Sequence, residues 1–276
     1  AQMEDVVIET TPITDSLHML EGRGGNLVVC TGADGIFLVD DQYAPLTEKI
    51  REAIADLQAG DVRFVLNTHW HGDHTGGNEN FGETGSVIVA HDNVRERMSV
   101  ENFSRFFDRS TPASTPGALP VVTFGDGVTF HLNDLTILVR HFPHAHTDGD
   151  AVVIFREANV IHTGDIVFHG LYPFIDVDSG GSVDGVIDAC AQILELADAE
   201  TKIVPGHGPI IGREDVATYR DMLVQIRDRV AAGIAAGDDL EAVQAAAPTA
   251  EWDETLGQVW LTGDQLTELV FRSLSD

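Results

Sequence analysis

One short segment, residues 68–74, constrains this chain more than any other feature of its sequence. It directly follows the apolar run 62–66, which predicts a buried strand. Within six positions it holds four residues that can bind a metal ion, namely His69, His71, Asp73 and His74. Two imidazoles two positions apart in an extended chain project to the same side and can share one ion, while a turn at Gly72 sends the next two donors elsewhere. One loop can therefore supply two metal ions.

Four further motifs accompany this loop. They are Asp40 at the end of the apolar run 37–39, His146-Thr147-Asp148-Gly149-Asp150, Thr163-Gly164-Asp165 and Pro205-Gly206-His207-Gly208. The sequence resembles the metallo-β-lactamase superfamily, because these motifs follow one another along the chain as they do in that family. Residues 69–74 match in full the family motif of His, any residue, His, any residue, Asp, His. The ligand set, with an aspartate at position 165, is similar to that of the glyoxalase II group. The resemblance covers roughly residues 20 to 212.

The resemblance implies an α+β fold, a four-layer αββα sandwich of two mixed β-sheets flanked by helices. Residues 1–212 would form the core of this fold, and residues 213–276 a C-terminal helical extension packed on the same domain. Periodicity in the sequence agrees, because short apolar runs typical of strands alternate with helical patterns. Helices are expected at about 46–57, 92–108, 182–197, 213–235 and 264–274. Apolar residues of the tail, such as Val259 and Leu261, are expected in the core, although the tail could instead cover a cleft or form a dimer contact.

The resemblance also implies a role for each metal-binding residue. His69, His71 and His146 would hold a first zinc ion, Asp73, His74 and His207 a second, and Asp165 would bridge the two. Two Zn²⁺ ions are the expected cofactors, although a set of nitrogen and oxygen ligands could also hold Mn or Fe. Asp40 would support the ligands.

Two metal ions at such a site lower the pKa of a shared water, so a metal-bridging hydroxide is the expected nucleophile. Asp73 would act as the catalytic proton shuttle from this hydroxide to the leaving group. Phe168 occupies the position where some lactamases of the family carry a substrate-binding lysine, and residues 213–276 lack the basic cluster expected to bind glutathione.

We therefore expect a dinuclear zinc hydrolase that opens a small carbonyl compound, with a β-lactam or lactone ring first. A thioesterase or a small-molecule phosphodiesterase is the alternative on the same site. An iron-dependent oxidoreductase is the alternative from another class, since the family includes such enzymes.

Several other residues are candidates for contact with substrate or ligands. Trp70, between two ligands, is expected to pack or to line the cleft. His144 forms a second pair with His146 at positions i and i+2, so the two could exchange roles. His169 and His141 could also line the cleft.

Composition bounds the partners. The chain has 16 Lys and Arg against 45 Asp and Glu, a formal charge of −29, which disfavours nucleic acid and anionic membranes. No apolar run reaches the length of a membrane span. A small-molecule substrate is expected, and the oligomeric state stays open.

The first residues, Ala1-Gln2, suit an exported chain after signal-peptide removal, so a periplasmic or secreted location is expected and a cytoplasmic one stays open. Cys30 and Cys190 are expected to be buried thiols, and the sequence does not decide whether they pair.

Overall fold

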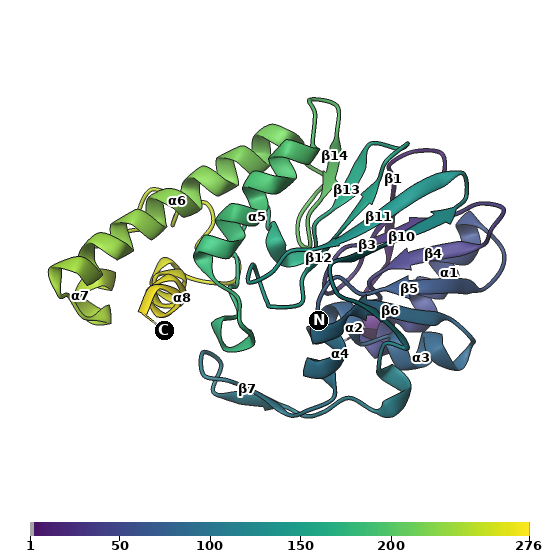
Figure 1. Cartoon of the computed structure of the whole chain (residues 1–276), viewed down its shortest axis with the longest axis horizontal. Coiled ribbons are helices and arrows are strands. Elements are labelled where there is room, and N and C mark those ends of the chain that lie inside the picture. The colour runs from purple at the N-terminus through teal and green to yellow at the C-terminus, as the bar shows by residue number, and fades with distance from the viewer. Residues whose placement is uncertain (1–2, 276) are drawn as a thin grey trace.

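The computed structural model describes residues 3–275 and arranges them in four layers, with two β-sheets stacked face to face between two layers of helices (Figure 1). The first sheet has seven strands in the order β1-β2-β3-β4-β5-β6-β9. They are β1 (Glu9–Pro12), β2 (Leu17–Glu21), β3 (Leu27–Cys30), β4 (Ile36–Val39), β5 (Val62–Leu66), β6 (Val87–His91) and β9 (Val122–Phe124). Strands β1 to β4 pair antiparallel, and β4, β5, β6 and β9 pair parallel, so the sheet is mixed.

The second sheet has five strands in the order β10-β11-β12-β13-β14, and only its last pair is parallel. They are β10 (Gly127–Leu132), β11 (Leu135–His141), β12 (Ala151–Phe155), β13 (Val160–His162) and β14 (Lys202–Val204). A separate hairpin consists of β7 (Asn102–Ser104) and β8 (Arg109–Thr111). The predicted fold class, an αββα sandwich with two mixed sheets, is confirmed.

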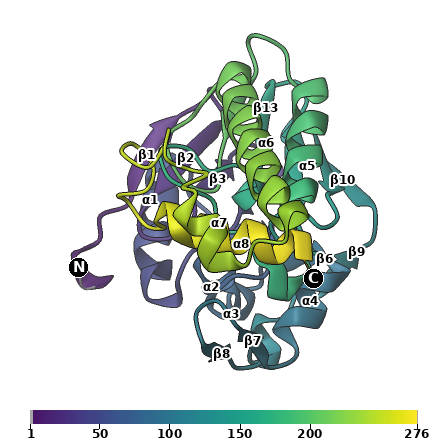
Figure 2. The same cartoon turned by 90° about the vertical axis from the view of Figure 1, so that its left-hand side faces the viewer.

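The helices form two groups. Those nearer the first sheet are α1 (Thr47–Leu57), α2 (Gly72–Thr75), α3 (Asn78–Glu83) and α4 (Asp92–Met98). Those on the outer side of the second sheet are α5 (Val183–Leu196), α6 (Arg213–Ala236), α7 (Leu240–Ala245) and α8 (Gly263–Ser275). Figure 2 faces this second group and shows α6 alongside α5, with α8 crossing near them. Short 3-10 helices fill turns, among them η1 (Met3–Asp5), η2 (Ala44–Leu46), η3 (Pro116–Ala118), η4 (Gly164–Ile166) and η5 (Val177–Ser179).

Alternation along the strands explains the layers. On β3, Val28 packs in the core between the two sheets, whereas its neighbour Val29 packs against α1 on the other face. Successive side chains of a strand point to opposite faces, so a strand buried on both sides reads as a continuous apolar run. A third core joins the second sheet to the outer helices and contains Leu266 and Val270 of α8.

The predicted helix over residues 92–108 was wrong in its second half. The helix ends at Met98, where the apolar pair at positions i and i+4, Val94 and Met98, has no continuation. The side chain of Asn102 donates to the carbonyls of Arg97 and Val100, which satisfies groups at the helix end and begins the β7–β8 hairpin. The short helices α3 and α7 were not predicted.

The two cysteines are free and buried in different cores. Cys30 lies between the two sheets, and Cys190 lies between the second sheet and the outer helices.

Across residues 3–275, the structure has no helix that is both long and apolar enough to cross a membrane.

Candidate metal centre

The candidate ligands lie where parallel strands end. The loop after β5 carries His69, the turn after β13 carries Asp165, and the loop after β14 carries His207. Because β4 and β5 are parallel, and β13 and β14 are parallel, the residues that follow them emerge at the same edge of the sandwich. Polar side chains far apart in sequence therefore meet at one place.

The structure brings the seven predicted ligands into two groups. Within each group the possible ligand atoms lie within 4.8 Å of one another. The first group is His69, His71, His146 and Asp165, and the second is Asp73, His74 and His207. These are the two sets that the family resemblance implied.

Asp165 lies between the groups. Its Oδ2 is 3.7 Å from Nε2 of His146 and 3.5 Å from Nε2 of His207, and its Oδ1 is 3.1 Å from Nε2 of His74. One carboxylate therefore faces donors of both groups, as a bridging ligand must.

The imidazoles of the first group are held at their outward nitrogens. His71 Nε2 lies 2.9 Å from Asp176 Oδ2, and His146 Nδ1 lies 2.7 Å from the carbonyl oxygen of Phe174. Their other nitrogens, Nδ1 of His71 and Nε2 of His146, face each other at 2.9 Å. A histidine that binds a metal ion commonly donates its second ring N–H to such a carbonyl or carboxylate.

Asp40 organises the second group and the loop before it. Its Oδ2 is 2.8 Å from Nδ1 of His74 and accepts a hydrogen bond of 2.7 Å from the hydroxyl of Thr68. Its Oδ1 accepts from the backbone N–H of Thr68 at 2.7 Å. The Thr68 hydroxyl is also 3.1 Å from Nδ1 of His69. The fully buried Asp40 thus orients one histidine of each group, directly or through Thr68.

One buried nitrogen tests whether a metal ion fits. Nε2 of His69 has no hydrogen-bond partner in the described chain, although the residue is only 1% exposed. A buried polar atom without a partner costs free energy, and in native structures such an atom calls for an explanation. An ion among the donors of the first group would supply that partner, so these residues fit a metal ion.

The electrostatics agree with neutral imidazoles at two ligands of the first group, His69 and His146. At His71, burial lowers the pKa, but the neighbouring Asp176 outweighs burial and raises it. Burial holds the pKa of His69 well below its usual range and lowers that of His146 to about 4. A metal ligand must be the unprotonated imidazole. His207 differs: burial lowers its pKa, but the neighbouring Asp165 and Asp73 outweigh burial and raise the pKa to about 9.

Two glycines are required by the close packing around the ligands. A Cβ on Gly25 would lie 2.0 Å from Cε1 of His74, and a Cβ on Gly206 would lie 1.9 Å from Oδ1 of Asp165. Any side chain at either position would displace a candidate ligand.

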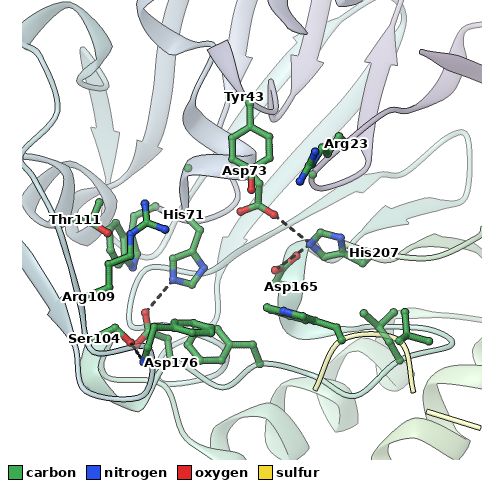
Figure 3. A pocket seen from close by; sticks show the side chains of 18 residues that line it. Arg23, Tyr43, His71, Asp73, Ser104, Arg109, Thr111, Asp165, Asp176 and His207 are labelled. Atoms are coloured by element: carbon green, nitrogen blue, oxygen red, sulfur yellow. Dashed lines mark hydrogen bonds and ion pairs between the residues drawn. The ribbon is translucent and has the colours of Figure 1, made fainter. Parts of the chain in front are cut away.

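A cavity of about 930 Å³ opens beside the two groups. Figure 3 shows His71, Asp73, Asp165 and His207 pointing into it. The rest of its wall combines two arginines, Tyr43, small polar residues and apolar side chains, the last being Trp70, Phe107, Leu171, Phe174, Val259 and Trp260. The cavity has room for a substrate much larger than a single ring.

Of the other residues predicted to contact substrate or ligands, some line the cavity and others lie outside it. Trp70 lines the cavity. His169 does not, because Phe168 forms a bridge with His207 and stacks on its ring, so the next residue points away. His144 is exposed and bonds the carbonyl of Gly180, so His146 takes the inner position.

His141 is also outside the cavity wall, and its ring stacks on that of His91 with 3.7 Å between the ring centroids.

Sequence reasoning missed Asp176, Arg23 and Arg109. Asp176 lies in the segment Phe174-Ile175-Asp176-Val177-Asp178, which carries no recognisable motif, and no motif marks either arginine.

Comparison with known proteins identifies a family and similar proteins. Residues 18–213 match the family model described as the metallo-beta-lactamase superfamily. An atrochrysone carboxyl ACP thioesterase of Aspergillus terreus is 28% identical over 186 residues, 67% of this chain and 49% of that protein. An acyl-coenzyme A thioesterase of Gallus gallus is 27% identical over 163 residues, 54% of this chain and 58% of that protein. The chain thus spans about half the length of these relatives.

Among solved structures, a metallo-beta-lactamase from Pontibacter korlensis superimposes with a TM-score of 0.64 at 18% identity, covering 78% of this chain and 98% of that one. At this identity the likeness concerns the fold alone.

Proposed function

The chain belongs to the metallo-β-lactamase superfamily, and from this premise we propose that it is a dinuclear zinc hydrolase that cleaves an acyl thioester. The observation that carries the proposal is the pair of donor groups, seven side chains that converge beside a cavity. Four of their imidazoles, those of His69, His71, His74 and His146, are held at one ring nitrogen by hydrogen bonds. A His/Asp cluster in a family that is typically metal-dependent supports a hydrolase that uses metal ions.

His69, His71 and His146 would hold the first ion, Asp73, His74 and His207 the second, and Asp165 both. Nitrogen and carboxylate donors suit zinc, and they also suit Mn or Fe. When bound, two divalent ions supply Lewis acidity, which lowers the pKa of a water and polarises a carbonyl. The protein's own residues would orient these groups and move the proton.

Asp73 is the residue that we propose accepts and returns a proton. Burial raises its pKa, but the neighbouring His74 and the hydrogen bond from His207 outweigh burial and lower the pKa to about 2. The carboxylate is therefore ionised at neutral pH and points into the cavity (Figure 3). In this position it would take a proton from the attacking water and pass it to the leaving sulfur.

A thioester now ranks ahead of the β-lactam or lactone ring that the sequence favoured. Two relatives with similar sequences are named as thioesterases, and the likeness to a β-lactamase concerns the fold alone. The cavity is large and partly apolar, which suits an acyl chain.

The test is hydrolysis of a butyryl thioester of N-acetylcysteamine by zinc-replete protein, with thiol release followed by Ellman's reagent. A chromogenic cephalosporin, a lactone and a small phosphodiester are assayed in parallel, together with oxygen uptake by iron-loaded protein. We expect thioester turnover that chelator and His69→Ala abolish.

Asp73→Asn should lower turnover by orders of magnitude while the first group still binds zinc. Turnover close to normal in this variant would refute the shuttle role. Oxygen consumption with iron, and no hydrolysis of any ester with zinc, would overturn the hydrolase.

A further inference from the structure

Two arginines line the cavity on either side of the candidate metal centre. Figure 3 shows Arg109 on the side of His71 and Arg23 on the side of His207. Within residues 3–275 they are the only Lys or Arg side chains in the cavity wall. We propose that these two guanidinium groups bind an anionic group of the substrate, so that the enzyme prefers an acyl compound whose acyl chain carries a carboxylate. Hydrolysis of such a compound rests on the function proposed above, whereas binding of its carboxylate by the two arginines does not.

The position of Arg23 is set by the backbone. It belongs to the turn between β2 and β3, where the N–H of Gly25 donates to the carbonyl oxygen of Asp73 at 3.1 Å. At Gly24, whose φ is +116°, a Cβ would lie 2.9 Å from that same oxygen. The turn therefore lies directly against α2, which carries Asp73 and His74, and Arg23 is placed at the rim of the centre.

The position of Arg109 is set by the β7–β8 hairpin. Arg109 is paired across the hairpin with Ser104, and both line the cavity. The neighbouring Arg105 N–H donates to Asp178 Oδ2 at 2.7 Å, and Arg272 of α8 lies 2.8 Å from Asp178 Oδ1. The hairpin is thus tied to the outer helical layer and faces the centre.

The negative charges of the cavity wall are already engaged at the centre. Asp73 Oδ2 and Asp165 Oδ2 lie 3.4 Å and 3.5 Å from Nε2 of His207, and Asp176 Oδ2 lies 2.9 Å from Nε2 of His71. Arg109, by contrast, is exposed and makes no ion pair with a described residue. The rim therefore offers positive charge to a ligand.

The overall charge of −29 does not oppose this site. At physiological salt, charges separated by more than about 8 Å are largely screened, so groups at the rim decide what binds there. A guanidinium presents a planar fork of N–H donors that matches a carboxylate. Among only 16 Lys and Arg in the chain, two in one cavity wall form a local exception to an acidic surface.

The apolar part of the same wall gives the rest of the substrate a place. The ring of Phe174 lies 5.0 Å from that of Phe107 and 6.1 Å from that of Trp260. Phe107 and Trp260 are each 47% exposed, which is unusual for such large apolar side chains. This aromatic wall suits methylene groups between the reacting carbonyl and the anion.

Binding is tested without catalysis. Two stable thioethers of N-acetylcysteamine are compared by titration calorimetry, one with a chain that ends in a carboxylate and one that ends in the matching neutral amide. We expect the carboxylate to bind about tenfold to a hundredfold more tightly, as charge-assisted hydrogen bonds imply. Arg109→Gln and Arg23→Gln should each reduce this preference, and Arg109→Lys should restore part of it. Equal affinities for the two thioethers would overturn the proposal.

The kinetic arm compares glutaryl and glutaramoyl thioesters of the same thiol. In Arg109→Gln, KM for the glutaryl substrate should rise about tenfold or more, and the preference for the glutaryl over the glutaramoyl substrate should fall with it. Arg156→Gln, in an exposed turn at the far end of β12, is the matched control and should change neither. An unchanged preference in Arg109→Gln and Arg23→Gln would also overturn the proposal. Carboxylate binding without any hydrolysis would instead refute only the proposed function.

Discussion

Asp176→Asn should weaken metal binding by the first donor group without disturbing the fold. The Asp176 carboxylate lies 2.9 Å from Nε2 of His71 and so keeps a proton on that nitrogen and a lone pair on Nδ1, which faces His146. An asparagine can place its N–H₂ against Nε2 and so favour the other tautomer, with the proton on Nδ1. His71 would then present a proton where a ligand needs a lone pair.

The magnitude follows from burial of the pair. The two side chains are only 17% and 6% exposed, so solvent screens their contact little. Hydrogen bonds to charged groups contribute about 1.5–3 kcal/mol, and loss of a partner that orients a metal-binding histidine costs roughly 10- to 100-fold in metal affinity. Asp176 also accepts from the N–H of Ser179 at 3.1 Å, a role that the asparagine oxygen can keep. We therefore expect weaker metal binding, together with a fall of a few degrees in the melting temperature of the metal-free protein, which still folds.

The assay is competition for zinc with a chromophoric chelator, which resolves the two binding steps. Asp184→Asn, an exposed change of the same kind at the start of α5, is the control. If Asp176→Asn binds both ions as tightly as the unaltered protein does, the carboxylate does not set the tautomer of His71, and the reasoning fails.

Two further predictions concern packing. Gly25→Ala should abolish binding of the second ion, because the new Cβ would lie 2.0 Å from the His74 ring, whereas Gly125→Ala, with no atom within 4 Å, should bind both ions normally in zinc titrations. Cys30 and Cys190 should not react with Ellman's reagent at pH 8 in the native protein and should give two thiols after denaturation. Burial raises the pKa of both thiols, that of Cys190 to about 12, so the reactive thiolate is scarce at pH 8. If denaturation released no thiols, the two cysteines would form a disulfide.

Much of the fold was predictable because its elements are local. Continuous apolar runs such as 62–66 identify strands buried on both faces, and helical periodicity located α1, α5, α6 and α8 within a few residues. The prediction failed at residues 99–108, where polar composition is compatible with helix but Asn102 ends it. Short elements such as α3 carry too few periods to be recognised.

The side chains of the candidate centre could be identified from the amino-acid sequence, because a dense run of donors after a buried strand has few other uses. How these donors are held, and what surrounds them, depends on tertiary packing. Asp176 meets His71 across 105 positions of the chain, and Arg23 and Arg109 reach one cavity from two separate hairpins. Such contacts depend on how sheets, turns and helices pack in three dimensions, and a single carboxylate or guanidinium leaves no periodic trace in the sequence that would reveal its partner.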